Sequence, residues 1–272
     1  MPTAAADVEH GSFTDQGPWV LDLDDPAAIP WRRSVDRLRA DVRASLPELT
    51  RARRVPPGAR VVTTLRHLGG AVGLWALRER KLDRPARIAG ISRRVRVAAE
   101  HLGPTYIKLG QILSSGEGIF PEELVTEFRK LRDKVPAEPW PVVKRVIEDD
   151  LGRSIDSVFL DIDHTPIAAA SIAQVHAATL RTGERVVVKV QRPTVARMVR
   201  RDLAAMSWIA PVMVGRIPIS ALANPPALVD LFAETIVEEL DFRLEAANML
   251  DVARILAETD QRTMVVPRPH PT

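Results

Sequence analysis

AAASIAQVHAATLRTGERVVVKVQRP, residues 168–193, is the stretch that decides the fold class. Its alternating apolar and β-branched residues predict strands over residues 171–179 and 185–190. Thr182 and Gly183 lie between them and are typical of a tight turn, so the two strands form an antiparallel hairpin. Because most of the remaining chain has helical periodicity, the sequence predicts an α+β protein.

Lys189 is the residue of this hairpin that is most able to take part in ligand binding or catalysis. Side chains of a strand alternate between its faces, so Val186, Val188 and Val190 face a core while Lys189 faces the other way. A lysine held on a strand can place its ammonium charge against phosphate oxygens. The alternative is an ordinary exposed lysine, which is the commoner case for a single strand lysine.

The alanine-rich string Ala168-Ala169-Ala170-Ser171 precedes the hairpin. A kinase has its glycine-rich loop in this place, where glycine lets backbone N–H groups approach phosphates closely. Alanine restricts φ and adds a methyl group, so a loop built from it would hold a nucleotide differently. The alternative is a small-residue turn packed under a helix.

Helical periodicity dominates the rest of the chain. An amphipathic helix over residues 61–80 has the apolar set Val62, Leu65, Leu68, Val72, Leu74, Trp75 and Leu77. The other predicted helices cover residues 31–54, 88–115 with a joint at Gly103-Pro104, a short stretch from Pro121 that Pro136 ends, 140–151 capped by Gly152, 193–214, and one long helix over 227–258. Further strands are predicted over residues 157–160 and from Val265 and Val266.

The predicted long helix carries four acidic residues, Glu234, Glu238, Glu239 and Asp241. A kinase lobe needs a helix glutamate to hold the strand lysine. The alternative is a solvated acidic face. Glu239 and Asp241 are two residues apart and do not share a helix face, so they reach different partners.

A polar pair, Lys108 and Gln111, interrupts the apolar helix over residues 88–115. The two residues are three apart and face the same way. Gly110 between them permits close approach by another element. An ordinary amphipathic helix explains each residue singly but not the pair.

Charge is distributed unevenly along the chain. Residues 1–30 hold six acidic residues and no lysine or arginine, whereas residues 31–97 hold 17 arginines and one lysine against five acidic residues. The basic stretch indicates a surface for anionic lipid or an acidic partner. Nucleic acid is not expected, because no nucleic-acid motif accompanies the charge and aromatic residues make up only 4%.

The chain has no cysteine, which excludes disulfides and thiolate metal sites. A signal peptide and a membrane span are not predicted either.

Four motifs, in this order, resemble those of the UbiB family, also called the AarF-domain or ADCK atypical kinases. They are Lys108-Leu109-Gly110-Gln111 (the Lys-x-Gly-Gln signature), the alanine-rich loop of residues 168–176, the strand lysine of residues 187–193, and Glu239-Leu240-Asp241 (the Glu-x-Asp helix). The resemblance implies a protein-kinase-like small lobe, a short antiparallel sheet plus a long helix, with a helical N-terminal extension that folds over the active site.

The resemblance also implies roles for these residues. Lys189 contacts the phosphates of ATP, and residues 168–171 cover them. Glu239 and Asp241 engage the cover formed by Lys108, Gly110 and Gln111. The glutamate that pairs with Lys189 stays open among Glu234, Glu238 and Glu239. The implied cofactors are ATP and Mg²⁺. The implied function is an atypical kinase or ATPase linked to isoprenoid-quinone or membrane-lipid metabolism, cytoplasmic and peripheral at the inner face of the membrane.

The predicted organisation has four parts: a disordered acidic leader (residues 1–30), a basic helical segment (31–87), the Lys-x-Gly-Gln extension (88–152) and the small lobe (153–272). The family's catalytic-loop Asp and Asn and its Asp-Phe-Gly metal site do not follow Val266. We therefore expect a truncated chain with no metal ligands, inactive without the large C-terminal lobe or a partner chain. The alternative is a non-catalytic pseudokinase fragment that binds a membrane or a partner.

Overall fold

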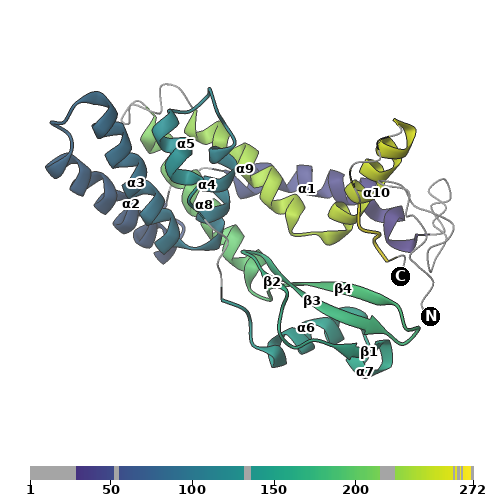
Figure 1. Cartoon of the computed structure of the whole chain (residues 1–272). Coiled ribbons are helices and arrows are strands. Elements are labelled where there is room, and N and C mark those ends of the chain that lie inside the picture. Colours follow the sequence, from purple (N-terminus) through teal and green to yellow (C-terminus); the bar gives the residue numbers. More distant parts are fainter. Residues whose placement is uncertain are drawn as a thin grey trace. The chain divides into compact units, whose positions relative to one another are not determined.

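The computed structural model describes residues 29–51, 55–131, 136–214, 224–259, 261, 264 and 266–270. The chain forms two compact units: a terminal unit, Met1–Leu46 with Glu234–Thr272, and a central unit, Pro47–Ala233 (Figure 1). The predicted leader lies outside the described residues except for Ile29 and Pro30. The four-part organisation predicted from the sequence stays a prediction.

The central unit contains one small antiparallel sheet (Figure 1). Strand β3 (Ala173–Leu180) pairs with the three other strands, β1 (Phe159–Ile162), β2 (Ala168–Ala169) and β4 (Arg185–Gln191). The predicted hairpin is thus confirmed as β3 and β4, and Gly183 in its turn has φ of 88°. The α+β class and the small-lobe sheet are confirmed.

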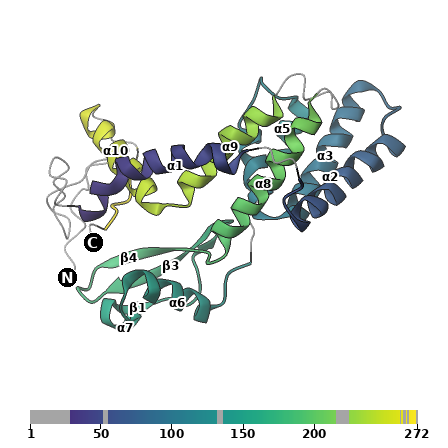
Figure 2. The same ribbon diagram turned by 180° about the vertical axis from the view of Figure 1, so that it is seen from behind.

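Helices α6 (Trp140–Leu151) and α7 (Ile155–Val158) cover one face of this sheet (Figure 2). The core between them consists of Val143, Ile147, Ile155, Phe159, Ile162, Ala178 and Val190, with Val186 and Val188 packed against it. Gly152 ends α6 in the left-handed conformation, φ 64°, as the sequence predicts. The alternation predicted for the lysine strand is therefore confirmed.

The strand predicted over residues 157–160 is only partly present. Residues Ile155–Val158 form the short helix α7, and β1 begins at Phe159. The helix forms because its first N–H group, that of Ile155, donates to the Glu148 carboxylate at 3.1 Å. The Ile155 side chain then enters the core.

Among the described residues, the central unit also contains the helices α2 (Ala59–Arg78), α3 (Arg84–Leu102), α4 (Pro104–Ser114), α5 (Glu122–Phe128), α8 (Val195–Met213) and the start of α9 (Pro225–Glu239). The joint between α3 and α4 is where the sequence predicts it, at Gly103 with φ of 98°. Pro121 caps α5 from outside instead of starting it, and α5 ends at Phe128, well before Pro136. Within the described ranges, no helix combines the length and apolarity needed to cross a bilayer.

The helix predicted over residues 61–80 is present as α2, and most of its predicted apolar set is exposed. Val62 is 66% exposed and Leu77 84% exposed, whereas the buried residues of α2 are Val61, Thr64 and Ala71. The helix packs on α3 and α8 through this narrow stripe. Most of the bulkier apolar side chains therefore lie at the surface of α2.

The terminal unit joins the two ends of the described chain. The predicted helix over residues 31–54 is a 3₁₀ turn, η1 (Pro30–Ser34), followed by α1 (Val35–Leu49), and residues 52–54 lie outside the described residues. Val35 packs with Leu244 and Ala247 of α10 (Phe242–Glu258). Arg39 of α1 donates to the Asn248 side chain at 2.9 Å.

The single long helix predicted over residues 227–258 is wrong. The chain forms two helices, α9 and α10, separated at Leu240 and Asp241. The Asp241 carboxylate accepts the backbone N–H of Arg243 at 3.0 Å and so caps α10. A helix cap of this kind stabilises the break because it satisfies a backbone donor that has no partner in its own helix. Val266 is not in a strand, and Val265 lies outside the described residues.

Candidate nucleotide-binding site

The lysine strand β4 presents Lys189 on the face of the sheet opposite α6. Lys189 and Val187 are exposed, Val187 to 64%. Val190, the next residue of the strand, points to the other face and is buried in the core. We call the side of Val187 and Lys189 the open face. The backbone pairing of β4 with β3 fixes the start of the lysine side chain on this face.

The alanine string reaches the same face. Ala168 pairs with Val175, and Val175 pairs with Lys189, so the three residues form one row across three adjacent strands. Residues paired across strands project to the same side. Because neighbouring strands lie about 4.8 Å apart, Ala168 and Lys189 are separated by about 10 Å on the open face.

The turn between β2 and β3 is short. Ala168 and Ala169 are in β2, and the Ala170 N–H donates to the Ala173 carbonyl at 2.8 Å. Ser171 in this turn is buried. Of the four residues predicted to cover the phosphates, two are therefore strand residues and two are turn residues.

Arg192 fastens this turn to the rest of the unit. Its side chain is 8% exposed, and its Nε donates to the Ala170 carbonyl at 3.0 Å. Its backbone N–H donates to the Ile172 carbonyl at 2.9 Å. Its Nη1 donates to the Glu138 carboxylate at 2.9 Å and its Nη2 to the Pro136 carbonyl at 2.8 Å. The sequence analysis names Arg192 as part of the lysine-strand motif but predicts no role for it. The one signal in the sequence is its position directly after the predicted strand.

A chain of buried polar groups continues from Arg192 under the sheet. The Gln174 amide oxygen accepts the Glu138 backbone N–H at 2.8 Å, and its amide nitrogen donates to His176 Nε2 at 2.9 Å. The other ring nitrogen, Nδ1, donates to the Asp163 carbonyl at 2.7 Å. Gln174 and His176 are both buried, and every polar atom of the His176 ring has a partner. Such a satisfied network favours one arrangement of the strands around it.

The Lys-x-Gly-Gln residues lie on α4. Lys108 and Gln111 are partly buried, and Gly110 is buried. A Cβ at Gly110 would lie 2.2 Å from Leu131 Cδ1, so glycine is what allows the residue after α5 to pack directly on α4. This is the close approach that the sequence indicates.

The acidic residues predicted to serve the site belong to the terminal unit, at the end of α9 and the start of α10. Glu234, Glu238 and Glu239 are partly buried. Asp241 is held by Arg243, whose Nε and Nη2 donate to its two oxygens at 2.9 and 2.6 Å. These hydrogen bonds hold the pKa of the Asp241 carboxyl below its ordinary value. Since Lys189 and Lys108 are in the central unit, their pairing with these acids stays a prediction.

Comparison with known proteins shows the family of the chain. Residues 130–271, just over half of the chain, match the family model of the ABC1 atypical kinase-like domain. The chain belongs to this family. The match contains the alanine turn, Lys189, Arg192 and the Glu-x-Asp residues, and it confirms the resemblance to UbiB proteins.

Individual members of the ABC1 family support the same relationship. The probable protein kinase UbiB of Pseudomonas paraeruginosa (strain DSM 24068 / PA7) is 40% identical over 192 residues, 70% of this chain and 35% of that protein. The protein of the same name from Pseudomonas fluorescens (strain Pf0-1) is 41% identical over 161 residues, 59% of this chain and 30% of that protein. The one from Marinobacter nauticus is 38% identical over 161 residues. The chain thus spans about a third of the length of these relatives.

Proposed function

We propose that this ABC1-family chain binds ATP on the open face of its sheet, with Lys189 against the phosphates and residues 168–171 beside them. The observation that carries the proposal is the row formed by Ala168, Val175 and Lys189. It places the lysine side chain and the strand that leads into the alanine turn on one exposed surface. An ammonium group placed this way is a strong partner for phosphate oxygens.

Lys189 should provide a large share of the phosphate affinity. The N–H groups of Ile167 and Ala170 are used within the sheet, by the carbonyls of Val175 and Ala173 at 2.7 and 2.8 Å. The turn therefore offers fewer backbone donors than a glycine-rich loop whose N–H groups point at phosphates.

The proposal extends to the chemistry of the family. The function is an atypical kinase or ATPase linked to isoprenoid-quinone or membrane-lipid metabolism, with Mg²⁺ bound together with ATP. The described residues contain no cluster of three or more His, Cys, Asp or Glu side chains able to hold a metal ion, and no step is assigned to one. Because the sequence carries no catalytic-loop or Asp-Phe-Gly motif, we expect these 272 residues alone not to turn over ATP.

Titration of the purified chain with ATP by calorimetry tests the binding proposal. Replacing Lys189 with alanine should weaken ATP binding about 10- to 100-fold, the range for losing a charge-assisted bond. Arg185→Ala is the matched control, because Arg185 is an exposed cation on the same strand and face, about 13 Å away. Binding that survives Lys189→Ala, or falls equally in both variants, would contradict the proposal.

A second function is favoured by the surface of α2. Val62, Leu65 and Leu77 are exposed there, in the segment that carries the arginine excess. An amphipathic helix with basic and apolar groups can lie in an anionic bilayer interface. We propose that residues 31–97 hold the protein peripherally on the inner face of the membrane.

Vesicle flotation tests this second proposal. The chain should float with vesicles containing phosphatidylglycerol and not with pure phosphatidylcholine. Leu65→Ser with Leu77→Ser should abolish flotation. Leu160→Ser is the control, since Leu160 is 65% exposed but lies on β1. Equal flotation of wild type and the double variant would exclude α2 as the membrane contact.

A further inference from the structure

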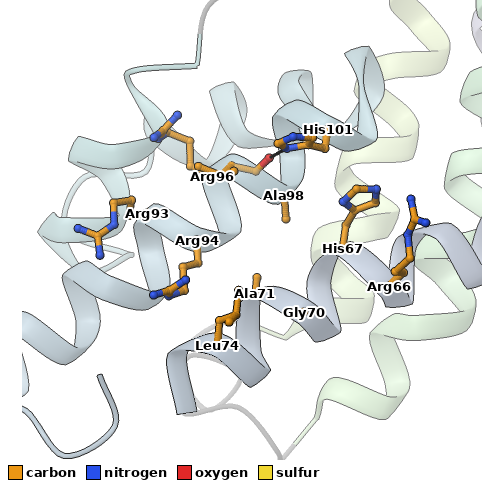
Figure 3. A pocket seen from close by; sticks show the side chains of 11 residues that line it. Arg66, His67, Gly70, Ala71, Leu74, Arg93, Arg94, Arg96, Ala98 and His101 are labelled. Atoms are coloured by element: carbon orange, nitrogen blue, oxygen red, sulfur yellow. Dashed lines mark hydrogen bonds between the residues drawn. The ribbon is translucent and has the colours of Figure 1, made fainter. Parts of the chain in front are cut away.

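A hollow of about 400 Å³ lies between α2 and α3, within the central unit (Figure 3). Its volume is in the range of small-molecule sites, about 300–1,000 Å³. Arg66 and His67 line it from α2, and Arg93, Arg94, Arg96 and His101 line it from α3. Among the described residues that line it there is no acidic side chain. Four arginines and two histidines therefore line one hollow, and the carboxylates near it lie outside its lining.

Two histidines from different helices meet in this hollow. The rings of His67 and His101 are stacked, with centroids 5.5 Å apart and planes 19° from parallel (Figure 3). His101 Nδ1 lies 2.7 Å from the Val97 carbonyl oxygen. Since a carbonyl can only accept, Nδ1 carries the proton, and Nε2 is the nitrogen of His101 that can meet a ligand.

The arginines of the hollow differ in how their charge is balanced. Arg93 and Arg94 both donate to Glu79, and Arg96 donates to Glu100 and Glu127. In the part of the chain that the structure describes, Arg66 has neither a carboxylate nor another hydrogen-bond partner. It stands next to His67 on α2 (Figure 3). Burial first, and then the positive charges of Arg66, His101 and Arg60, lower the pKa of His67.

Small and apolar residues also line the hollow. Gly70 and Ala71 line it from α2, and Val97 and Ala98 from α3. A Cβ added at Gly70 would meet no atom within 4 Å, so the hollow is open at this point. A small anion that carries a short apolar group fits these arginines and apolar residues better than an extended chain does.

We propose that the α2–α3 hollow binds a phosphate group, carried either by a small phosphate ester or by the headgroup of a phospholipid. Arg66 is the main donor to the phosphate oxygens, and the stacked rings of His67 and His101 complete the wall of the site. Guanidinium groups suit this task because their planar N–H groups match phosphate oxygens. The inference does not depend on ATP binding at Lys189. In the phospholipid case it deepens the membrane proposal.

Calorimetric titration of the full chain with inorganic phosphate and with glycerol 3-phosphate tests the site. Arg66→Gln should weaken binding about tenfold, the effect of losing one charge-assisted bond. Arg84→Gln is the matched control. Arg84 is an exposed arginine at the start of α3, and it does not line the hollow. It should leave affinity within about twofold. Both sites are exposed, so thermal melting should show both variants folded.

A double variant tests the histidines. His67→Ala with His101→Ala removes both stacked rings from the hollow and should bind phosphate more weakly than the wild type does. Unchanged phosphate affinity in the double variant would exclude the histidines from the site.

Vesicles distinguish the two sources of phosphate. Binding of glycerol 3-phosphate assigns the hollow to a soluble ester. Binding only to vesicles with phosphatidic acid, lost in Arg66→Gln, assigns it to a headgroup. Absence of phosphate binding in both forms, preference for an acidic peptide, or equal weakening by Arg84→Gln would overturn the proposal. Vesicle binding that persists in Arg66→Gln would overturn the hollow as a lipid site but leave the α2 membrane proposal standing.

Discussion

The guanidinium group of Arg192 holds the carbonyl of Ala170, with 3.0 Å between Nε and the oxygen. This bond joins the residue that follows the lysine strand to the turn that leads into the hairpin. The same guanidinium group reaches Glu138 and Pro136, ahead of α6. Arg192 therefore connects the turn beside Lys189 with the segment that leads to the covered face of the sheet.

Arg192→Ala should loosen the alanine turn. The substitution removes three side-chain bonds and leaves the Glu138 carboxylate without its partner, which should lower the free energy of unfolding by about 2 kcal/mol. Amide hydrogen exchange over residues 168–173 should accelerate more than exchange in α6. ATP affinity should fall as well, although Arg192 itself does not lie on the open face.

Arg181→Ala is the matched control for Arg192. Arg181 is an exposed arginine of the same sheet region whose Nε donates to the Asp156 carbonyl at 2.8 Å. Its loss should change stability by less than about 0.5 kcal/mol. Unchanged hydrogen exchange in the turn of the Arg192 variant would show that Arg192 does not position it.

Gly110→Ala should destabilise the central unit. The new Cβ would lie 2.2 Å from Leu131 Cδ1, so the buried Leu131 side chain would have to move away from α4 within a packed core. Overpacking of this kind costs about 1–3 kcal/mol. Chemical denaturation measures the change, and adding Leu131→Ala should recover part of a loss that comes from this contact.

Gly69→Ala is the opposite case on α2. A Cβ at Gly69 would meet nothing within 4 Å, so only helix propensity changes. The substitution should stabilise the protein by about 0.5–1 kcal/mol. If both glycine substitutions stabilised the protein, the tight contact at Gly110 would be disproved.

The ion pair of Arg60 and Asp202 should be important for the attachment of α2 to α8. Arg60 Nε donates to Asp202, whose side chain is 1% exposed. Burial, which outweighs the nearby Arg60, raises the pKa of Asp202. Removal of one partner from a buried pair costs about 3–5 kcal/mol because it leaves an unpaired charge.

Arg60→Met should therefore lower the free energy of unfolding by about 3 kcal/mol, since Arg60 itself is partly exposed. The double variant Arg60→Met with Asp202→Leu should be more stable than Arg60→Met alone. A double variant no more stable than the single one would mean that lost packing, and not the unpaired carboxylate, causes the destabilisation.

Asp241→Ala should fray the start of α10. It removes the cap on Arg243 N–H and the two side-chain bonds from Arg243, at a cost of about 1 kcal/mol or slightly more. Asp241→Asn retains a capping side chain and loses the charge, so it should cost less. Circular dichroism during denaturation measures both variants.

The contribution of Asp241 should depend on pH in a defined direction. The pKa of its carboxyl is lower in the folded protein than the ordinary value of 3.8. The stabilisation is thus present above that ordinary value and is lost as the pH falls through the lower folded-state pKa. The free energies of unfolding of the wild type and of Asp241→Asn should become equal when the pH falls below the folded-state pKa of Asp241. Curves that stay parallel down to that pH would contradict the ion pair.

The sequence by itself determined the elements whose signals are local. The alternation of Val186, Val188 and Val190 fixes the side of the strand on which Lys189 lies, because the backbone of a strand permits only two directions. Gly103 and Gly152 mark helix ends because their backbones need a left-handed or otherwise glycine-like conformation. The family motifs could be found from the sequence for the same reason, since each is a short contiguous string.

Tertiary structure decided the rest, where the deciding contact joins distant residues or competes with local periodicity. The helical pattern runs through Leu240 and Asp241, and only the hydrogen bonds around Asp241 show that the helix breaks there. The buried stripe of α2 is set by the neighbours on which the helix packs, α3 and α8. The bond from Arg192 to Ala170 spans 22 residues, and the contact of Gly110 with Leu131 spans 21, so neither leaves a periodic signal in the sequence.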